Sequence, residues 1–260
     1  MNIVVLAKQV PDTDKVKIDP ESGTMVREGF EAVMNTFDLH ALELALQMKE
    51  MVGGSVLVIS MGPPNTEDIL REALALGADR ATLVSDRIFA GSDTLVTSLV
   101  LKRVIERYEF DLILAGEKAT DGETGQVGPE VGAMMNLPVI TYVSKLLGIK
   151  KDSLIVERSV EDGLEEWEVH LPALLTVSRS VSEPRFPTLS GKKKAMKMEV
   201  EVLRFSDLEL KTDQVGIRGS PTKVVKVFNV SVTRKADMYE GKRISEGIDR
   251  VVEILRRFSR

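Results

Sequence analysis

Residues 111–129 read Asp-Leu-Ile-Leu-Ala-Gly-Glu-Lys-Ala-Thr-Asp-Gly-Glu-Thr-Gly-Gln-Val-Gly-Pro, an apolar run followed by a loop rich in Gly, Thr and Asp. Residues 130–135 continue in a helix-compatible pattern. Glycines let a backbone approach a ligand closely, and a helix start supplies N–H donors, so this order suits a bound phosphate group. The stretch indicates a nucleotide-binding loop, and it leaves open the alternative of an ordinary surface loop between a strand and a helix.

Apolar runs upstream of this loop alternate with helical patterns. The predicted strands are rich in β-branched residues, as expected of strands buried on both faces, and cover residues 3–7, 55–60, 81–84 and 111–115. The predicted helices cover residues 39–51, 66–76 and 94 to about 108. Asn35 and Asp38 are expected to cap the first helix, and residues 92–94 the third. This alternation predicts an α/β fold, a doubly wound and mostly parallel sheet with helices on both faces.

Further strand patterns lie downstream of the loop. Residues 140–143 and 173–177 are predicted strands, and residues 153–157 could pair with residues 165–170 as a hairpin. A smaller hairpin is predicted within residues 16–26. We expect the sheet to be complete near Ser180, which gives a nucleotide-binding domain of residues 1–181.

The carboxyl ends of parallel strands are where such sheets bind ligands. This rule brings the segments after residues 7, 60 and 115 to one edge, where the helix start at residues 35–38 can join them. The candidate cofactor-binding residues are Leu6, Ala7, Lys8, Asn35, Phe37, Asp38, Met61, Gly116, Thr120, Asp121, Gly122, Thr124, Gly125, Gln126 and Val127. The carboxylates of Asp121 and Glu123 could be read as a catalytic pair, but in this loop they are better suited to shaping the turn or binding ribose and adenine.

Residues 182–260 show little strand and helix alternation. Only residues 245–258 regain helical periodicity, through Ile248, Val251, Val252, Leu255 and Phe258. This stretch has few apolar groups whose burial could offset the entropy lost on ordering it. We therefore expect it to be an arm that wraps another subunit, and the alternative is a partly disordered tail. The basic run Lys192–Lys194 is read either as a solvated face or as an exposed docking surface.

Composition excludes several classes of function. The chain carries 35 Lys and Arg against 40 Asp and Glu, a net charge of -5, so nucleic acid is not an expected partner. It has no Cys and 2 His, which disfavours thiol chemistry, iron–sulfur clusters and His-rich metal sites. Because Cys is absent, any redox chemistry would have to be carried by an organic cofactor. No Gly-x-Ser-x-Gly or P-loop sequence is present, which disfavours a serine nucleophile and phosphoryl transfer. The amino terminus lacks a signal-like pattern, and a cytoplasmic protein without membrane insertion is expected.

Several motifs together resemble a known family. In chain order they are residues 6–10, 35–38, 60–63, 77–79, 119–129, 171–173, 184–186 with 192–197, and 219–223. Their order is similar to that in the β subunit of electron transfer flavoprotein, whose fold is like that of adenine-nucleotide hydrolases. The resemblance implies a heterodimer with an α subunit, an adenine nucleotide in the β subunit, electrons carried by FAD, and no catalytic side chain. It also implies a C-terminal arm on the α subunit and a partner-docking segment with Leu189, Lys192, Lys193 and Lys194.

The family contains two kinds of β subunit. One holds AMP as a structural ligand, and the other carries Asp-Gly-x-Thr-x-Gln-Val-Gly-Pro, holds FAD in the same place and is associated with electron bifurcation from NADH. Residues 121–129 are similar to the second pattern. The resemblance therefore implies FAD rather than AMP, with NADH as donor and ferredoxin, flavodoxin, an acyl-CoA dehydrogenase or a quinone-reducing membrane complex as redox partners.

Functions of other classes remain as competing hypotheses. A nucleotide-binding regulatory module would share the α/β architecture but would have no use for a long tail. An adenylating enzyme would need a pyrophosphate loop of the type Ser-Gly-Gly-x-Asp-Ser after the first strand, and residues 8–12 do not provide it.

Overall fold

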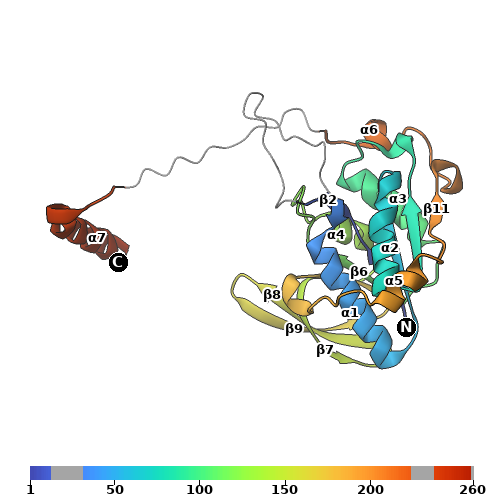
Figure 1. The fold of residues 1–260 in the computed structure, drawn as a ribbon, viewed down its shortest axis with the longest axis horizontal. Coiled ribbons are helices and arrows are strands. Elements are labelled where there is room, and N and C mark those ends of the chain that lie inside the picture. The colour runs from blue at the N-terminus through green and yellow to red at the C-terminus, as the bar shows by residue number, and fades with distance from the viewer. Residues whose placement is uncertain (13–31, 224–236, 259–260) are drawn as a thin grey trace.

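The computed structural model of the chain describes residues 1–12, 32–223 and 237–258. Its centre is a nine-stranded sheet in the order β11-β5-β4-β1-β6-β10-β7-β8-β9 (Figure 1). Neighbours from β11 to β7 pair in parallel, whereas β8 and β9 pair antiparallel at one end. The strands are β1 (Asn2–Leu6), β4 (Ser55–Met61), β5 (Arg80–Val84), β6 (Leu112–Gly116), β7 (Val139–Ile149), β8 (Ser153–Val160), β9 (Gly163–His170), β10 (Ala173–Val177) and β11 (Glu201–Leu203). The predicted doubly wound α/β fold is confirmed.

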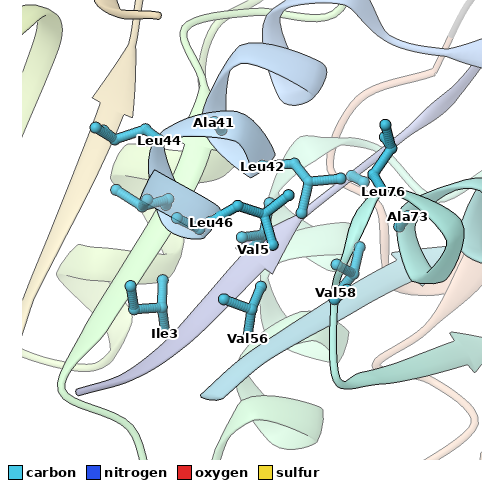
Figure 2. Packing of buried hydrophobic residues seen from close by; sticks show 14 of the residues in the cluster. Ile3, Val5, Ala41, Leu42, Leu44, Leu46, Val56, Val58, Ala73 and Leu76 are labelled. Carbon is cyan, nitrogen blue, oxygen red and sulfur yellow. The ribbon is translucent and has the colours of Figure 1, made fainter. Parts of the chain in front are cut away.

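Helices cover both faces of this sheet. On one face lie α1 (Thr36–Val52) and α2 (Glu67–Leu76), and on the other lie α3 (Thr94–Ile105) and α4 (Val127–Met134). Alternate residues of β1 feed the two cores, with Ile3 and Val5 on the α1 side and Val4 and Leu6 on the α3 side. Figure 2 shows Ile3, Val5 and their neighbours on β4 beneath the leucines and alanines of α1 and α2.

The start of α1 differs from the prediction. The helix begins at Thr36, and although Asn35 occupies the N-cap position, its side chain makes no capping hydrogen bond. Asp38 lies inside the first turn. The expectation that these two residues cap the helix is therefore wrong, because both side chains bind other segments instead. The cap expected for α3 is confirmed, since the Asp93 carboxylate accepts a hydrogen bond from the N–H of Val96.

The hairpin predicted from residues 153–170 is present as β8 and β9. Strand β7 is longer than predicted, and its register with β10 shifts near Tyr142, which adopts a φ of 59°. Beside β1, a separate two-stranded sheet joins β2 (Gln9–Pro11) to β3 (Ala32–Met34). The hairpin predicted within residues 16–26 lies outside the described residues.

The chain after residue 181 returns to the domain. Arg185 forms ion pairs with Glu43 and Glu50 of α1, helix α5 (Leu189–Ala195) packs on α2, and β11 extends the sheet beside β5. Nothing in the sequence pattern predicts β11, because three residues are too few to show a strand period. Helix α7 (Ile244–Phe258) has exposed apolar side chains, among them Ile248 and Val251. Within the described ranges no helix combines the length and the apolar character that crossing a membrane requires.

Candidate functional site

The first turn of α1 ties together the carboxyl ends of β1 and β6. The carboxylate of the buried Asp38 accepts hydrogen bonds from the backbone N–H groups of Lys8, at 2.8 Å, and Gly116, at 3.0 Å. Lys8 follows β1, and Gly116 is the last residue of β6. One side chain therefore sets the spacing of the two strand ends at the edge where the sequence places the ligand.

Asn35 extends this connection into the loop after β6. Its fully buried side chain donates to the carbonyl oxygen of Lys118, at 2.9 Å, and accepts from the N–H of Thr120, at 3.2 Å. Its own N–H donates to the carbonyl of Lys8 at 2.8 Å. Two polar residues of one helix turn thus fix the β1 end and the loop start, and we call Lys8, Asn35, Asp38, Gly116 and Thr120 the edge network.

Gly116 is required by the closeness of this packing. A Cβ atom at residue 116 would lie 2.5 Å from Oδ1 of Asp38 and 2.6 Å from Cβ of Phe37. Real side chains do not approach so closely, so only glycine allows α1 to reach the strand end.

The loop beyond Thr120 turns back on itself. The N–H groups of Gly122 and Glu123 both donate to the carbonyl of Ala119, and Glu123 and Gly125 adopt positive φ values of 53° and 63°. An ion pair of 2.7 Å joins Lys8 Nζ to Asp121 Oδ1 across the edge. Within the described residues, the N–H groups of Thr124, Gly125 and Gln126 make no hydrogen bond. These donors at the start of α4 are available to an anionic ligand.

Helix α3 supports the far end of the loop. The hydroxyl of Thr94 donates to Gln126 Oε1 at 3.2 Å and to Glu130 Oε1 at 3.1 Å, and Ser98 donates to Glu130 Oε2 at 2.9 Å. Gly128 lies close to Thr176, since a Cβ atom added at Gly128 would be 2.7 Å from the methyl carbon of Thr176. The start of α4 is therefore held by α3 on one side and by β10 on the other.

The remaining predicted site residues fall into separate groups. Leu6, Ala7, Met61 and Val127 pack against the two hydrophobic cores at the strand and helix ends. A Cβ atom added at Gly122 would have no atom of the described residues within 4 Å, its two chain neighbours apart. The predicted docking residues Leu189, Lys192, Lys193 and Lys194 lie on α5, which packs on α2 apart from the edge network.

One residue at this edge has no counterpart in the prediction. Arg179 follows β10, and its guanidinium carbon lies 4.6 Å from the ring centroid of Phe37. Lys118 Nζ lies 5.9 Å from the same centroid. The signal that could have revealed Arg179 is its place just beyond the carboxyl end of a predicted strand, the rule already applied to the other segments.

Hollows also occur at the opposite edge of the sheet. One of about 300 Å³ is lined by Asn2, Arg80 and Tyr108, and one of about 520 Å³ by Asp111, Lys150 and Pro172. Neither hollow includes a residue of the edge network. We place the candidate site at the carboxyl edge, because parallel sheets bind ligands there and the unpaired N–H donors of the loop lie there. Within the described residues no cluster of three or more His, Cys, Asp or Glu could hold a metal ion.

Burial raises the pKa of Asp38 from 3.8 to about 7, against the lowering effects of the Lys8 N–H, the Asn35 side chain, the Gly116 N–H and the Lys8 charge. A carboxyl whose pKa is raised in the folded state binds more protons in that state than in the unfolded state. Its contribution to the free energy of unfolding is therefore complete below about pH 4 and is lost as the pH rises through 7. In Asp38→Asn this pH dependence should disappear. The amide oxygen can accept from only one of the two N–H groups, so a loss of about 1–3 kcal/mol in unfolding free energy is also expected.

Urea denaturation of the full chain at pH 5, 6, 7 and 8 measures both effects. The stability difference between the native chain and Asp38→Asn should shrink toward pH 8. The exposed residue Asp68 on α2 provides the control Asp68→Asn, which should keep the native pH profile. A native profile in Asp38→Asn would mean that another group titrates.

Comparison with known proteins adds independent evidence. A family model described as electron transfer flavoprotein domain matches residues 22–208. The chain is 46% identical over 256 residues to an electron transfer flavoprotein subunit beta of Thermoanaerobacterium thermosaccharolyticum, covering 98% of each chain. It is 42% identical to subunit CarD of the caffeyl-CoA reductase-Etf complex of Acetobacterium woodii, covering 95% of this chain and 94% of CarD. It is 41% identical to protein FixA of Azotobacter vinelandii, covering 88% and 84%.

These matches span the sheet, the edge network and the loop before α4. The match to the family model takes in most of the chain, and the relatives are aligned along most of their own length. The chain therefore belongs to the electron transfer flavoprotein family, as a β-type subunit that takes part in electron transfer.

Proposed function

We propose that this subunit binds FAD at the carboxyl edge of its sheet and carries electrons within a heterodimer with an α subunit. The observation that carries the proposal is the edge network. Through Asn35 and Asp38 it holds the ends of β1 and β6 and the following loop in one arrangement. A site that is fixed before binding loses less entropy when the ligand arrives.

The residues present suit a dinucleotide. The N–H groups of residues 124–126, unpaired within the described residues, would hold the pyrophosphate. The ion pair between Lys8 and Asp121 would hold the loop in place beside it. Beyond its two chain neighbours, no atom of the described residues lies within 4 Å of a Cβ at Gly122, which leaves space on that side of the loop. Bound FAD would supply the electron-accepting chemistry that no side chain of this chain offers, while the chain positions it and excludes water.

The choice of FAD over AMP is supported by the loop. Residues 121–129 are similar to the pattern of the FAD-holding, bifurcating kind of β subunit. On this proposal NADH is the hydride donor, and ferredoxin or flavodoxin and a higher-potential acceptor receive the electrons. Relatives named for caffeyl-CoA reductase and acryloyl-CoA reductase support an enzyme that acts on acyl-CoA compounds as one partner.

The α subunit is proposed to cover the exposed apolar face of α7. Ile244, Ile248, Val251, Val252 and Leu255 lie on this helix and are between 39% and 60% exposed. Burial of each such side chain is worth roughly 1.5–3 kcal/mol, so a partner is needed to stabilise the helix. Leu189 and the lysines of α5 are proposed to face the redox partner.

Counting released ligands tests the proposal. The complex purified with its α subunit should release FAD from both subunits and no AMP after denaturation, as measured by chromatography of the supernatant. NADH should bleach the flavin absorbance of the intact complex, and NADPH serves as the matched control for the donor. Release of AMP together with a single FAD would instead identify a conventional subunit with a structural nucleotide.

A further inference from the structure

Arg179 lies at the candidate site, and no described acidic residue forms an ion pair with it. It begins the short 3-10 helix Arg179–Val181 directly after β10, whose last residue, Val177, accepts a hydrogen bond from the N–H of Glu117. This bond places Arg179 beside the start of the loop. The side chain is exposed, and within the described residues it forms no ion pair; its contact is with the ring of Phe37.

An aromatic ring and a carboxylate bind a cation in different ways. The face of Phe37 attracts the guanidinium through its quadrupole and orients it. A carboxylate would also neutralise the charge. Because Phe37 carries no charge, the donors of Arg179 stay available to an anion, and a guanidinium binds phosphate oxygens through two parallel N–H groups.

The surroundings of Phe37 keep this arrangement in place. The ring is 7% exposed and belongs to the same helix turn as Asn35 and Asp38. Lys118 makes the other cation contact with the ring, and Asn35 binds its carbonyl oxygen. Its ammonium group forms an ion pair of 3.5 Å with Glu123. Both cations thus contact a ring that lies in the same helix turn as two members of the edge network.

Acidic groups lie near both cations, but within the described part of the chain none of them forms an ion pair with Arg179. Burial raises the pKa of the Glu117 carboxyl, while the charges of Lys118 and Arg179 act in the opposite direction. Asp121 is paired with Lys8. Among the described residues Glu123 pairs with Lys118 at 3.5 Å, and no carboxylate forms an ion pair with Arg179.

We infer that Arg179 and Lys118, held on the ring of Phe37, form an oxyanion subsite that binds a phosphate group of the adenine nucleotide. The inference rests on the proposed function, since it assigns two further residues to the same nucleotide site. On this inference Arg179 binds the ligand directly, and its contribution to the binding affinity depends on the charge of the ligand.

Pairs of ligands that differ only in the phosphate test this inference. The full chain in complex with its α subunit, depleted of nucleotide, is titrated calorimetrically with AMP and with adenosine. Arg179→Gln should weaken AMP binding about tenfold, equivalent to ~1.4 kcal/mol, and leave adenosine binding unchanged. Arg179→Lys should retain part of the affinity for AMP. When salt is raised from about 50 to 300 mM, the AMP affinity of Arg179→Gln should fall less than that of the native complex.

The control is Arg103→Gln, which removes an exposed arginine of α3 that pairs with Glu106 and should not change either affinity. Equal weakening of AMP and adenosine by Arg179→Gln would show a structural role and overturn the inference, as would unchanged AMP binding. If the native complex binds AMP and FAD but Arg179→Gln has no effect, only the subsite is wrong. A native complex that binds neither nucleotide would overturn the proposed function as well.

Discussion

Gly116→Ala is expected to destabilise the chain by about 3 kcal/mol and to abolish retention of the nucleotide. The added Cβ would lie 2.5 Å from Oδ1 of Asp38 and 2.8 Å from the carbonyl carbon of Phe37. The backbone of α1 would have to move, at an overpacking cost of about 1–3 kcal/mol, and the bond from Gly116 N–H to Asp38 would weaken. For a chain of this size the melting temperature should fall by roughly 6–12 °C.

Thermal unfolding and the flavin content of the purified complex measure these effects. Gly122→Ala is the matched control, because the same atom is added in the same loop at a position where the described residues, chain neighbours apart, have no atom within 4 Å. It should keep the native melting temperature and the native flavin content. Equal behaviour of the two variants would show that α1 does not depend on the close approach at residue 116.

Gly122→Trp is expected to remove the nucleotide while leaving the fold intact. A Cβ atom at residue 122 meets no atom of the described residues beyond its chain neighbours, so the melting temperature of the ligand-free chain should stay within about 2 °C of the native value. The indole would occupy space beside the unpaired N–H groups of residues 124–126. Affinity for FAD should fall about a hundredfold, equivalent to ~2.7 kcal/mol.

Equilibrium titration of the nucleotide-depleted complex with FAD gives the affinity, and circular dichroism reports the fold. Gly122→Ala again serves as the control for size and should bind FAD as the native complex does. Full FAD binding by Gly122→Trp would place the ligand away from this loop. Together with Gly116→Ala, the variant separates loss of the fold from loss of the site.

Much of the sheet is predictable because its strands are apolar runs. In β1, β6 and β10 all or nearly all side chains are buried, so the hydrophobic pattern alone marks them. The helix ends are less certain. Residues 36–38 belong to α1 although Asn35 and Asp38 resemble caps, because side-chain oxygens that can cap a helix can equally bind backbone groups of another segment.

The edge network shows the same limit. The sequence brings its segments to one edge through the strand order, but it does not predict that Asp38 joins Lys8 to Gly116, residues that are far apart in the chain. Arg179 and Phe37 provide a second case, since neither motif nor period links them. Strand β11 is a third, because its pairing with β5 comes from a return of the chain over α2.

The sequence by itself determined the α/β class, the succession of buried strands, the loop at residues 116–129 and the family, since burial patterns and motif order are properties of neighbouring residues. Only the tertiary structure decided which polar groups meet at the carboxyl edge, why residue 116 must be glycine, and which cation is left without an acidic partner among the described residues. The physical reason is that hydrogen bonds, close contacts and charge pairing depend on distances between segments that the fold brings together, and a linear pattern does not contain those distances.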